Sequence, residues 1–146
     1  MLQEEEVSIS LPDKLGSTLD TVFMDLLFSD DGDLVIQNGD LALTSNGAQE
    51  KQQMIMCRVR TNNPDWFHHP YIGADLDDLY GEPCTRETAQ KGIEQITKAL
   101  TSDGYISRDN LIVEAVPGYK EINFFIYTLD TETEEPIVLY WNLPGM

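Results

Sequence analysis

The sequence has few basic residues, few cysteines and no long apolar run, and each shortage excludes a class of function. Its 146 residues include 9 lysines and arginines against 26 aspartates and glutamates, which gives a formal net charge of −17. Such an acidic chain is poorly suited to bind nucleic-acid phosphates or an anionic membrane, and a basic protein partner or a solvated acidic surface fits it better. No apolar run approaches the length that crosses a bilayer.

The two cysteines, Cys57 and Cys84, form neither a CxxC pair nor a cysteine/histidine metal pattern. This usage favours a reducing compartment, and a single disulfide between them is the alternative. The N-terminal residues MLQEEEVSIS carry glutamates where a secretory signal needs basic and apolar residues. We therefore expect the protein to be made and folded in the cytosol.

Residue types that could support chemistry are present but not arranged for it. His68 and His69 lie near several aspartates, yet adjacent residues on an extended chain point in opposite directions and no third metal ligand is suitably spaced. The Asp31-Gly32 run resembles a calcium loop only faintly, because Leu27 stands where a carboxylate is required. We expect no metal, no cofactor and no catalytic residue, and therefore no enzyme.

The length and the 41% hydrophobic content suit one domain with a real core. We predict an N-terminal extension over residues 1–17 and a single domain over 18–146. Within it, apolar residues alternate over 22–28, 34–36 and 41–43, separated by Asp-Gly and Asn-Gly turns, which is typical of a small antiparallel meander.

Two helices and three strands are predicted next. Ser45-Asn46-Gly47 can begin the first helix, which carries arginines in its last turn, and Thr85 can cap the second, which Asp103-Gly104 ends. Strands follow over 111–116, 122–129 and 137–143, and the middle one is apolar on both faces. We predict an α+β fold of small antiparallel sheets, with both helices packed on the C-terminal three-stranded sheet. The other face of that sheet is left for the meander or another protein to cover.

The stretch Met54–Gly81 begins in the first helix, breaks at Asn62-Asn63-Pro64 and is then rich in stiff and bulky residues. The Asn63-Pro64 and His69-Pro70 steps bracket Trp66 and Phe67, and Gly73 follows Pro70 by three residues. Each proline forces an extended residue before it, so the chain must turn here. We expect an ordered crossover in which Trp66, Phe67 and Tyr71 are buried against the helices.

The order of these features resembles a known family. The run from "DGD-apolar-NGDLAL" through the helix ending "CRVRT" to the "WF-x-x-P-x-x-G" crossover is similar to contractile-tail baseplate wedge proteins, or sheath initiators, of tailed bacteriophages. The similarity extends from about Thr18 to the C-terminus. One departure is that many members carry a Glu-Pro-Arg triplet after the second helix, where this chain reads Ile106-Ser107-Arg108. Only Arg108 carries over.

The resemblance implies a structural virion protein of the tail baseplate, present in several copies around the tail axis. Its implied partners are the tail sheath protein, other wedge proteins and tail tube or hub proteins, and its implied action is to start the sheath by β-strand addition. Pro136 indicates that the last strand is an edge. Besides Arg108, we therefore take Ile112, Val138 and Tyr140 as candidate partner-binding residues.

Two alternatives belong to other classes. Some family members are labelled lysozyme-like, so a peptidoglycan-degrading tail lysozyme is one; it would need a carboxyl group with a raised pKa in a sugar-binding cleft. The other is an acidic DNA-mimic inhibitor, whose carboxylates should cluster on one regular face.

Overall fold

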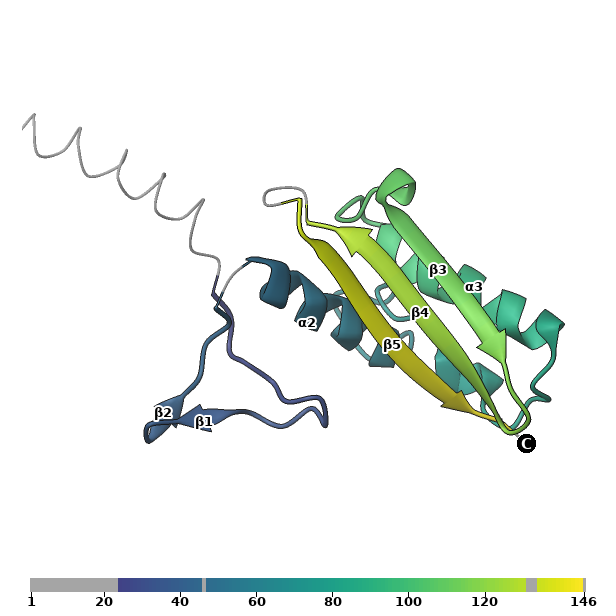
Figure 1. Ribbon diagram of the computed structural model, residues 1–146, viewed down its shortest axis with the longest axis horizontal. Helices are drawn as coiled ribbons and strands as arrows, with labels where there is room; N and C mark the ends of the chain where they lie inside the picture. Colours follow the sequence, from purple (N-terminus) through teal and green to yellow (C-terminus); the bar gives the residue numbers. More distant parts are fainter. Residues whose placement is uncertain (1–23, 46, 131–133, 146) are drawn as a thin grey trace, which may run out of the picture. The chain divides into compact units, whose positions relative to one another are not determined.

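The computed structural model describes residues 24–45, 47–130 and 134–145, so the predicted extension over 1–17 lies outside it. The chain divides into two compact units, Met1–Glu50 and Lys51–Met146. The fold is α+β, as predicted, with two helices, a two-stranded sheet and a three-stranded antiparallel sheet (Figure 1). The elements are β1 (Ile36–Gln37), β2 (Asp40–Leu41), α2 (Gly47–Arg60), the 3₁₀ helix η1 (Leu76–Leu79), α3 (Arg86–Thr101), the 3₁₀ helix η2 (Arg108–Asn110), β3 (Leu111–Pro117), β4 (Glu121–Leu129) and β5 (Pro136–Pro144).

The first unit contains the predicted double turn. Asn38 and Gly39 connect β1 to β2 with φ angles of 52° and 80°, which is the backbone of the tight two-residue hairpin turn that Asn-Gly favours. The Asp-Gly turn is also present, since the Gly32 N–H donates to the Ser29 carbonyl at 2.9 Å. Of the first predicted strand, residues 22 and 23 lie outside the described part of the chain.

The three segments of this unit close on one another rather than forming an open meander. The Leu27 N–H donates to the Ala42 carbonyl, the Ala42 N–H to the Val35 carbonyl, and the Val35 N–H to the Leu27 carbonyl, at 2.8–3.0 Å. Each segment therefore bonds both of the others. The predicted strands over 22–28, 34–36 and 41–43 are only partly found: the ladder is limited to β1 and β2, and the described part of 22–28 takes part through isolated bridges, Leu26 to Leu43 and Phe28 to Leu34. The short closed arrangement replaces the predicted meander of longer strands.

The second unit is built on the sheet β3-β4-β5. All three strands are antiparallel neighbours in sequence order, and β4 lies between the other two. Their bounds differ from the predicted ones by at most one residue, and β5 is an edge strand, as Pro136 indicated. The strand β3 is the opposite edge.

Both helices lie on the same face of this sheet, which confirms the predicted packing (Figure 1). Alternate residues of β4 point toward them and are almost fully buried, as are Ile55 and Val59 of α2 and Ile96 and Leu100 of α3. Gly92 allows α3 to approach closely, because a Cβ there would overlap the Phe124 ring. The core of the unit lies between this helical layer and one face of the sheet.

The helix ends follow the sequence signals. The Thr85 hydroxyl accepts a hydrogen bond from the Thr88 N–H at 3.3 Å and caps α3, as predicted. Gly104 follows the end of α3 with a φ of 77°. Among the described helices, none is long and apolar enough to span a membrane.

Candidate partner-binding edge and open face

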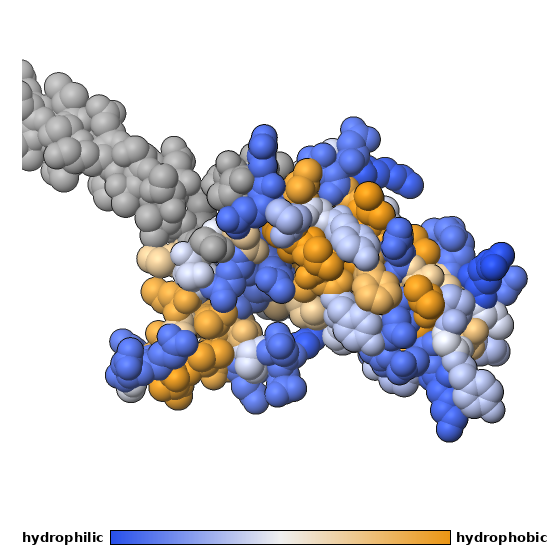
Figure 2. Space-filling model, viewed as in Figure 1, coloured by the Kyte–Doolittle hydropathy of each residue, from blue (hydrophilic) through white to orange (hydrophobic). Residues whose placement is uncertain are grey.

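One face of the three-stranded sheet carries no helix of the described second unit. Its side chains lie in cross-strand rows, of which Ile112, Tyr127 and Val138 form one and Glu114, Phe125 and Tyr140 the next. Ile112, Val138 and Tyr140 are each more than half exposed, at 59, 54 and 52%. Figure 2 shows this face with apolar and aromatic side chains gathered over the sheet. The structure thus places the three predicted partner-binding residues of the strands on one open face.

The open face changes character along its length. Near the β3–β4 turn it is polar, because the Asn123 Oδ1 accepts hydrogen bonds from the Tyr140 hydroxyl at 2.6 Å and from the Asn142 amide at 2.8 Å. The same Asn142 amide donates to Glu121 at 2.7 Å. The Phe125 and Tyr140 rings pack beside this network with centroids 5.6 Å apart. The network fixes the Tyr140 ring in place, so its exposed surface is ordered.

The two edges of the sheet differ in which backbone groups they present. Hydrogen-bonded pairs alternate along an antiparallel ladder, so a single known pair fixes the phase of the rest. The Gly145 N–H donates to the Lys120 carbonyl at 2.8 Å, and counting from this pair directs the N–H groups of Val138, Tyr140 and Asn142 outward. The Gly118 N–H donates to the Glu121 carbonyl at 2.7 Å, which by the same count directs Ile112 inward and Val113 outward.

The outer edge of β5 is apolar and bounded. Pro136 and Pro144 stand at its two ends in the outward phase, where a proline removes no ladder hydrogen bond. Between them the strand has no charged residue, whereas β3 carries Glu114 at its centre. Because charges and prolines are the usual protection of an edge, β5 is the less protected edge along its middle.

Arg108 lies in η2, immediately before β3, and is exposed. The two ion pairs found among the described residues, Lys51–Asp130 and Arg58–Asp103, do not include it. Arg108 therefore forms no ion pair with a carboxylate of the described residues. That it pairs with a carboxylate of a neighbouring protein stays a prediction.

The crossover is ordered, but not in the way the sequence predicted. Trp66, Phe67 and Tyr71 are 58, 89 and 75% exposed, so the expected burial of these rings is wrong. The apolar anchors are instead Ala74, Leu76 and Leu79, which are 1, 3 and 5% exposed. Pro70 is half-buried and Gly73 is buried.

Polar contacts hold the base of the crossover. The Asn63 backbone N–H donates to Asp75, and its amide donates to Asp75 at 2.8 Å and to the Gly73 carbonyl at 3.2 Å. The Gly73 N–H donates back to the Asn63 Oδ1 at 2.9 Å. A Cβ at Gly73 would overlap the carbonyl of Thr61, so only glycine fits where the two ends of the crossover meet. These contacts were not predicted from the sequence, although an asparagine close in sequence to several aspartates is a signal for side-chain hydrogen bonds to nearby backbone groups.

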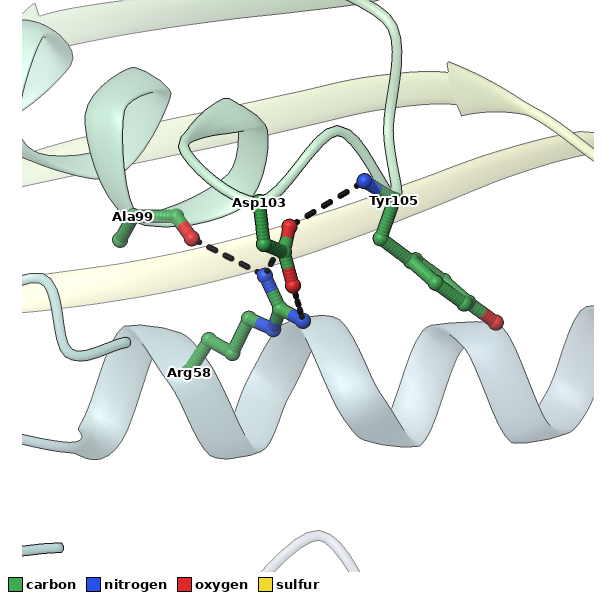
Figure 3. A network of polar contacts seen from close by, with 4 residues as sticks. All are labelled: Arg58, Ala99, Asp103 and Tyr105. Atoms are coloured by element: carbon green, nitrogen blue, oxygen red, sulfur yellow. Dashed lines mark hydrogen bonds and ion pairs between the residues drawn. The ribbon is translucent and has the colours of Figure 1, made fainter. Parts of the chain in front are cut away.

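Two ion pairs join α2 to other parts of the second unit, one near the end of α3 and one at the end of β4. The Arg58 guanidinium of α2 contacts both Asp103 oxygens, at 3.0 and 2.6 Å, and donates to the Ala99 carbonyl in the last turn of α3 at 3.2 Å (Figure 3). Hydrogen bonding from Arg58 lowers the pKa of Asp103, and the Tyr105 N–H adds to the effect. The second pair, Lys51–Asp130 at 3.3 Å, is buried and joins α2 to the end of β4. Sequence reasoning missed this pair, because a lysine inside a helix is usually exposed.

The described residues offer little to the chemical alternatives. Cys57 and Cys84 are both free, so the alternative of a disulfide between them is not found. No group of three or more metal-ligating side chains is found within the described ranges. Hydrogen bonds lower the pKa of Glu87 and that of Asp103, whereas a glycosidase general acid needs a raised pKa.

Comparison with protein-family models, curated proteins and solved structures found no significant match to this chain.

Proposed function

We propose that this protein is a structural component of a contractile-tail baseplate wedge, and that it starts the tail sheath by accepting a β-strand. The observation that carries the proposal is the outer edge of β5, which is uncharged and bounded by prolines, and which pairs with no strand of the described residues on that side. Such an edge is a template for an added strand, because its outward N–H and C=O groups have the spacing of a ladder.

The open face supports the same function. An added strand beside β5 would extend the face that already holds Val138 and Tyr140, so its side chains would gain apolar neighbours as well as backbone hydrogen bonds. Backbone bonds give affinity in this mode of recognition, and side-chain contacts choose the register. The assignment to a contractile tail rests on the sequence resemblance, and the implied partners are sheath, wedge and tube or hub proteins.

Arg108 has a separate role in this proposal. Its exposed guanidinium is available to a carboxylate of a neighbouring wedge protein, where bidentate geometry would fix orientation. Replacing it with alanine is expected to impair baseplate assembly while leaving the folding of the isolated chain unchanged.

The test is made on particles assembled with an altered chain. Val138→Pro removes an outward N–H of β5, and we expect completed baseplates and tubes without polymerised sheath in electron micrographs. Val138→Thr is the matched control, since it changes the side chain and keeps the N–H. Val113→Pro makes the same change on the β3 edge and should leave sheath intact. Full-length sheath with both proline variants would refute strand addition to this sheet.

A further inference from the structure

The described part of the first unit exposes a group of large apolar side chains. We call it the hairpin surface and define it by five side chains that are 44–69% exposed: Met24, Leu34, Ile36, Leu41 and Leu43. Figure 2 shows a dense apolar group over β1 and β2, edged by hydrophilic residues. Single exposed apolar residues are ordinary, but a contiguous group in so short a segment marks an interaction site.

The closure of the three segments explains why these side chains face outward. Because each segment bonds both of the others, little space is left between them, and among residues 24–45 the buried ones are the small Ala42 and Thr44. The Thr44 hydroxyl even accepts a hydrogen bond from the Asp25 N–H at 2.9 Å, so the interior is partly polar. An isolated hairpin without an apolar core is marginal in water, so covering the outer side chains of this segment would stabilise it.

The charges around the hairpin surface decide what can cover it. Residues 24–45 contain five aspartates, at positions 25, 30, 31, 33 and 40, and no lysine or arginine. A second copy would bring the same aspartates together and add another chain of charge −17, so self-association is opposed by repulsion. Complementarity requires a surface with an apolar centre and a basic rim.

We infer that the hairpin surface docks on a different protein, through a patch of apolar residues flanked by lysine and arginine. This inference rests on the proposed function for the setting in which the partner is met, and it concerns a surface separate from the β5 edge. The partner patch covers the five apolar side chains, and its cations lie against the aspartates of the two turns.

The inference is tested by photo-crosslinking from the tip of the hairpin. With p-benzoylphenylalanine replacing Ile36, which is 69% exposed, we expect a crosslink in assembled tails to a segment of another protein with basic residues around an apolar centre. A crosslink to the same chain, to a second copy, or to an acidic segment would overturn it, and so would the absence of any crosslink. If the chain is not found in tails, the proposed function fails. The same crosslinking in the producing cells then still tests the partner chemistry.

Charge variants test the basic rim. Asp31→Asn with Asp33→Asn should lower the crosslinking yield several-fold and weaken its dependence on salt, because two aspartates at the rim are removed. Glu82→Gln with Glu94→Gln removes two exposed carboxylates of the second unit and should change neither. Equal yields from both double variants would show that charge does not select the partner.

Hydrogen exchange gives a measurement that needs no crosslinker. In the isolated full chain the Leu27, Val35 and Ala42 amides should exchange rapidly, well ahead of the Phe124 and Ile126 amides of the core sheet. In assembled tails the three should slow by at least about 100-fold. Equal protection of hairpin and sheet in the isolated chain would mean that the unit is complete without a partner.

Discussion

Two proline substitutions on the sheet should have opposite effects on folding, although both replaced side chains are exposed and lie in the same cross-strand row. Ile112 and Val138 both oppose Tyr127, one from each side. Their N–H groups differ in direction, because the phase of each ladder directs the one from Ile112 toward β4 and the one from Val138 away from it. A proline has no N–H, so the two positions isolate the backbone contribution.

The expected magnitudes follow from this difference. Ile112→Pro removes a ladder bond and leaves the Tyr127 carbonyl without its donor, which costs about 1–3 kcal/mol, and the ring adds strain between the strands. Val138→Pro removes no bond of the isolated chain and should change the free energy of unfolding by about 1 kcal/mol or less. Against a total of roughly 5–15 kcal/mol, the first change is large.

The assay is urea unfolding of the purified chain, followed by circular dichroism, with Ile112→Thr and Val138→Thr as controls that keep both N–H groups. The threonine variants should resemble each other, and only Ile112→Pro should move the midpoint substantially. Equal destabilisation by both prolines would refute the assigned ladder phase. It would also remove the argument that the β5 edge is free to pair.

Three further predictions use other parts of the second unit. Trp66→Ala should change the free energy of unfolding by about 1 kcal/mol or less, since the ring is 58% exposed, and a loss of 3 kcal/mol in a thermal melt would show that it is buried. Gly73→Ala should destabilise by about 1–3 kcal/mol, because its Cβ would overlap the Thr61 carbonyl; an unchanged melting temperature would contradict the tight base. Asp103→Asn should cost about 1 kcal/mol or less, because the Asp103 side chain is 46% exposed and water screens its pair with Arg58. The pKa of Asp103 is lowered on folding, so this difference should be full above about pH 4 and vanish as the pH falls through the folded pKa; a difference independent of pH would refute the pair.

The sequence predicted the two helices and the three C-terminal strands well because their signals are local. The apolar pattern of each strand predicts β3, β4 and β5, the Asn-Gly pair predicts the turn between β1 and β2, and Thr85 caps α3 through a contact three residues away. The edge character of β5 was also readable, since Pro136 cannot donate to a ladder. The sequence could not predict which residues of each edge strand direct their backbone N–H groups outward. That direction depends on which opposite pairs of the folded ladder exchange hydrogen bonds.

The burial of the crossover was mispredicted for a physical reason. Hydrophobicity indicated that Trp66 and Phe67 should be buried, but the segment is closed by Asn63 and Asp75, whose contacts already fix its path. Once polar contacts order a loop, its large side chains are not needed to hold it. A similar non-local effect explains Lys51, which is buried because Asp130, 79 residues away, compensates its charge.

The prolines at the ends of β5 also limit the length of any strand that pairs with it. Only Val138, Tyr140 and Asn142 present outward N–H donors, because the same phase is filled by proline at 136 and 144. Three donors at alternate positions match acceptors spread over about five residues, or roughly 17 Å of extended chain at about 3.3 Å per residue. The edge of β5 therefore limits the useful length of an added strand. A segment of about five residues accepts from every outward N–H of β5, and a longer segment gains no further hydrogen bond from these N–H groups.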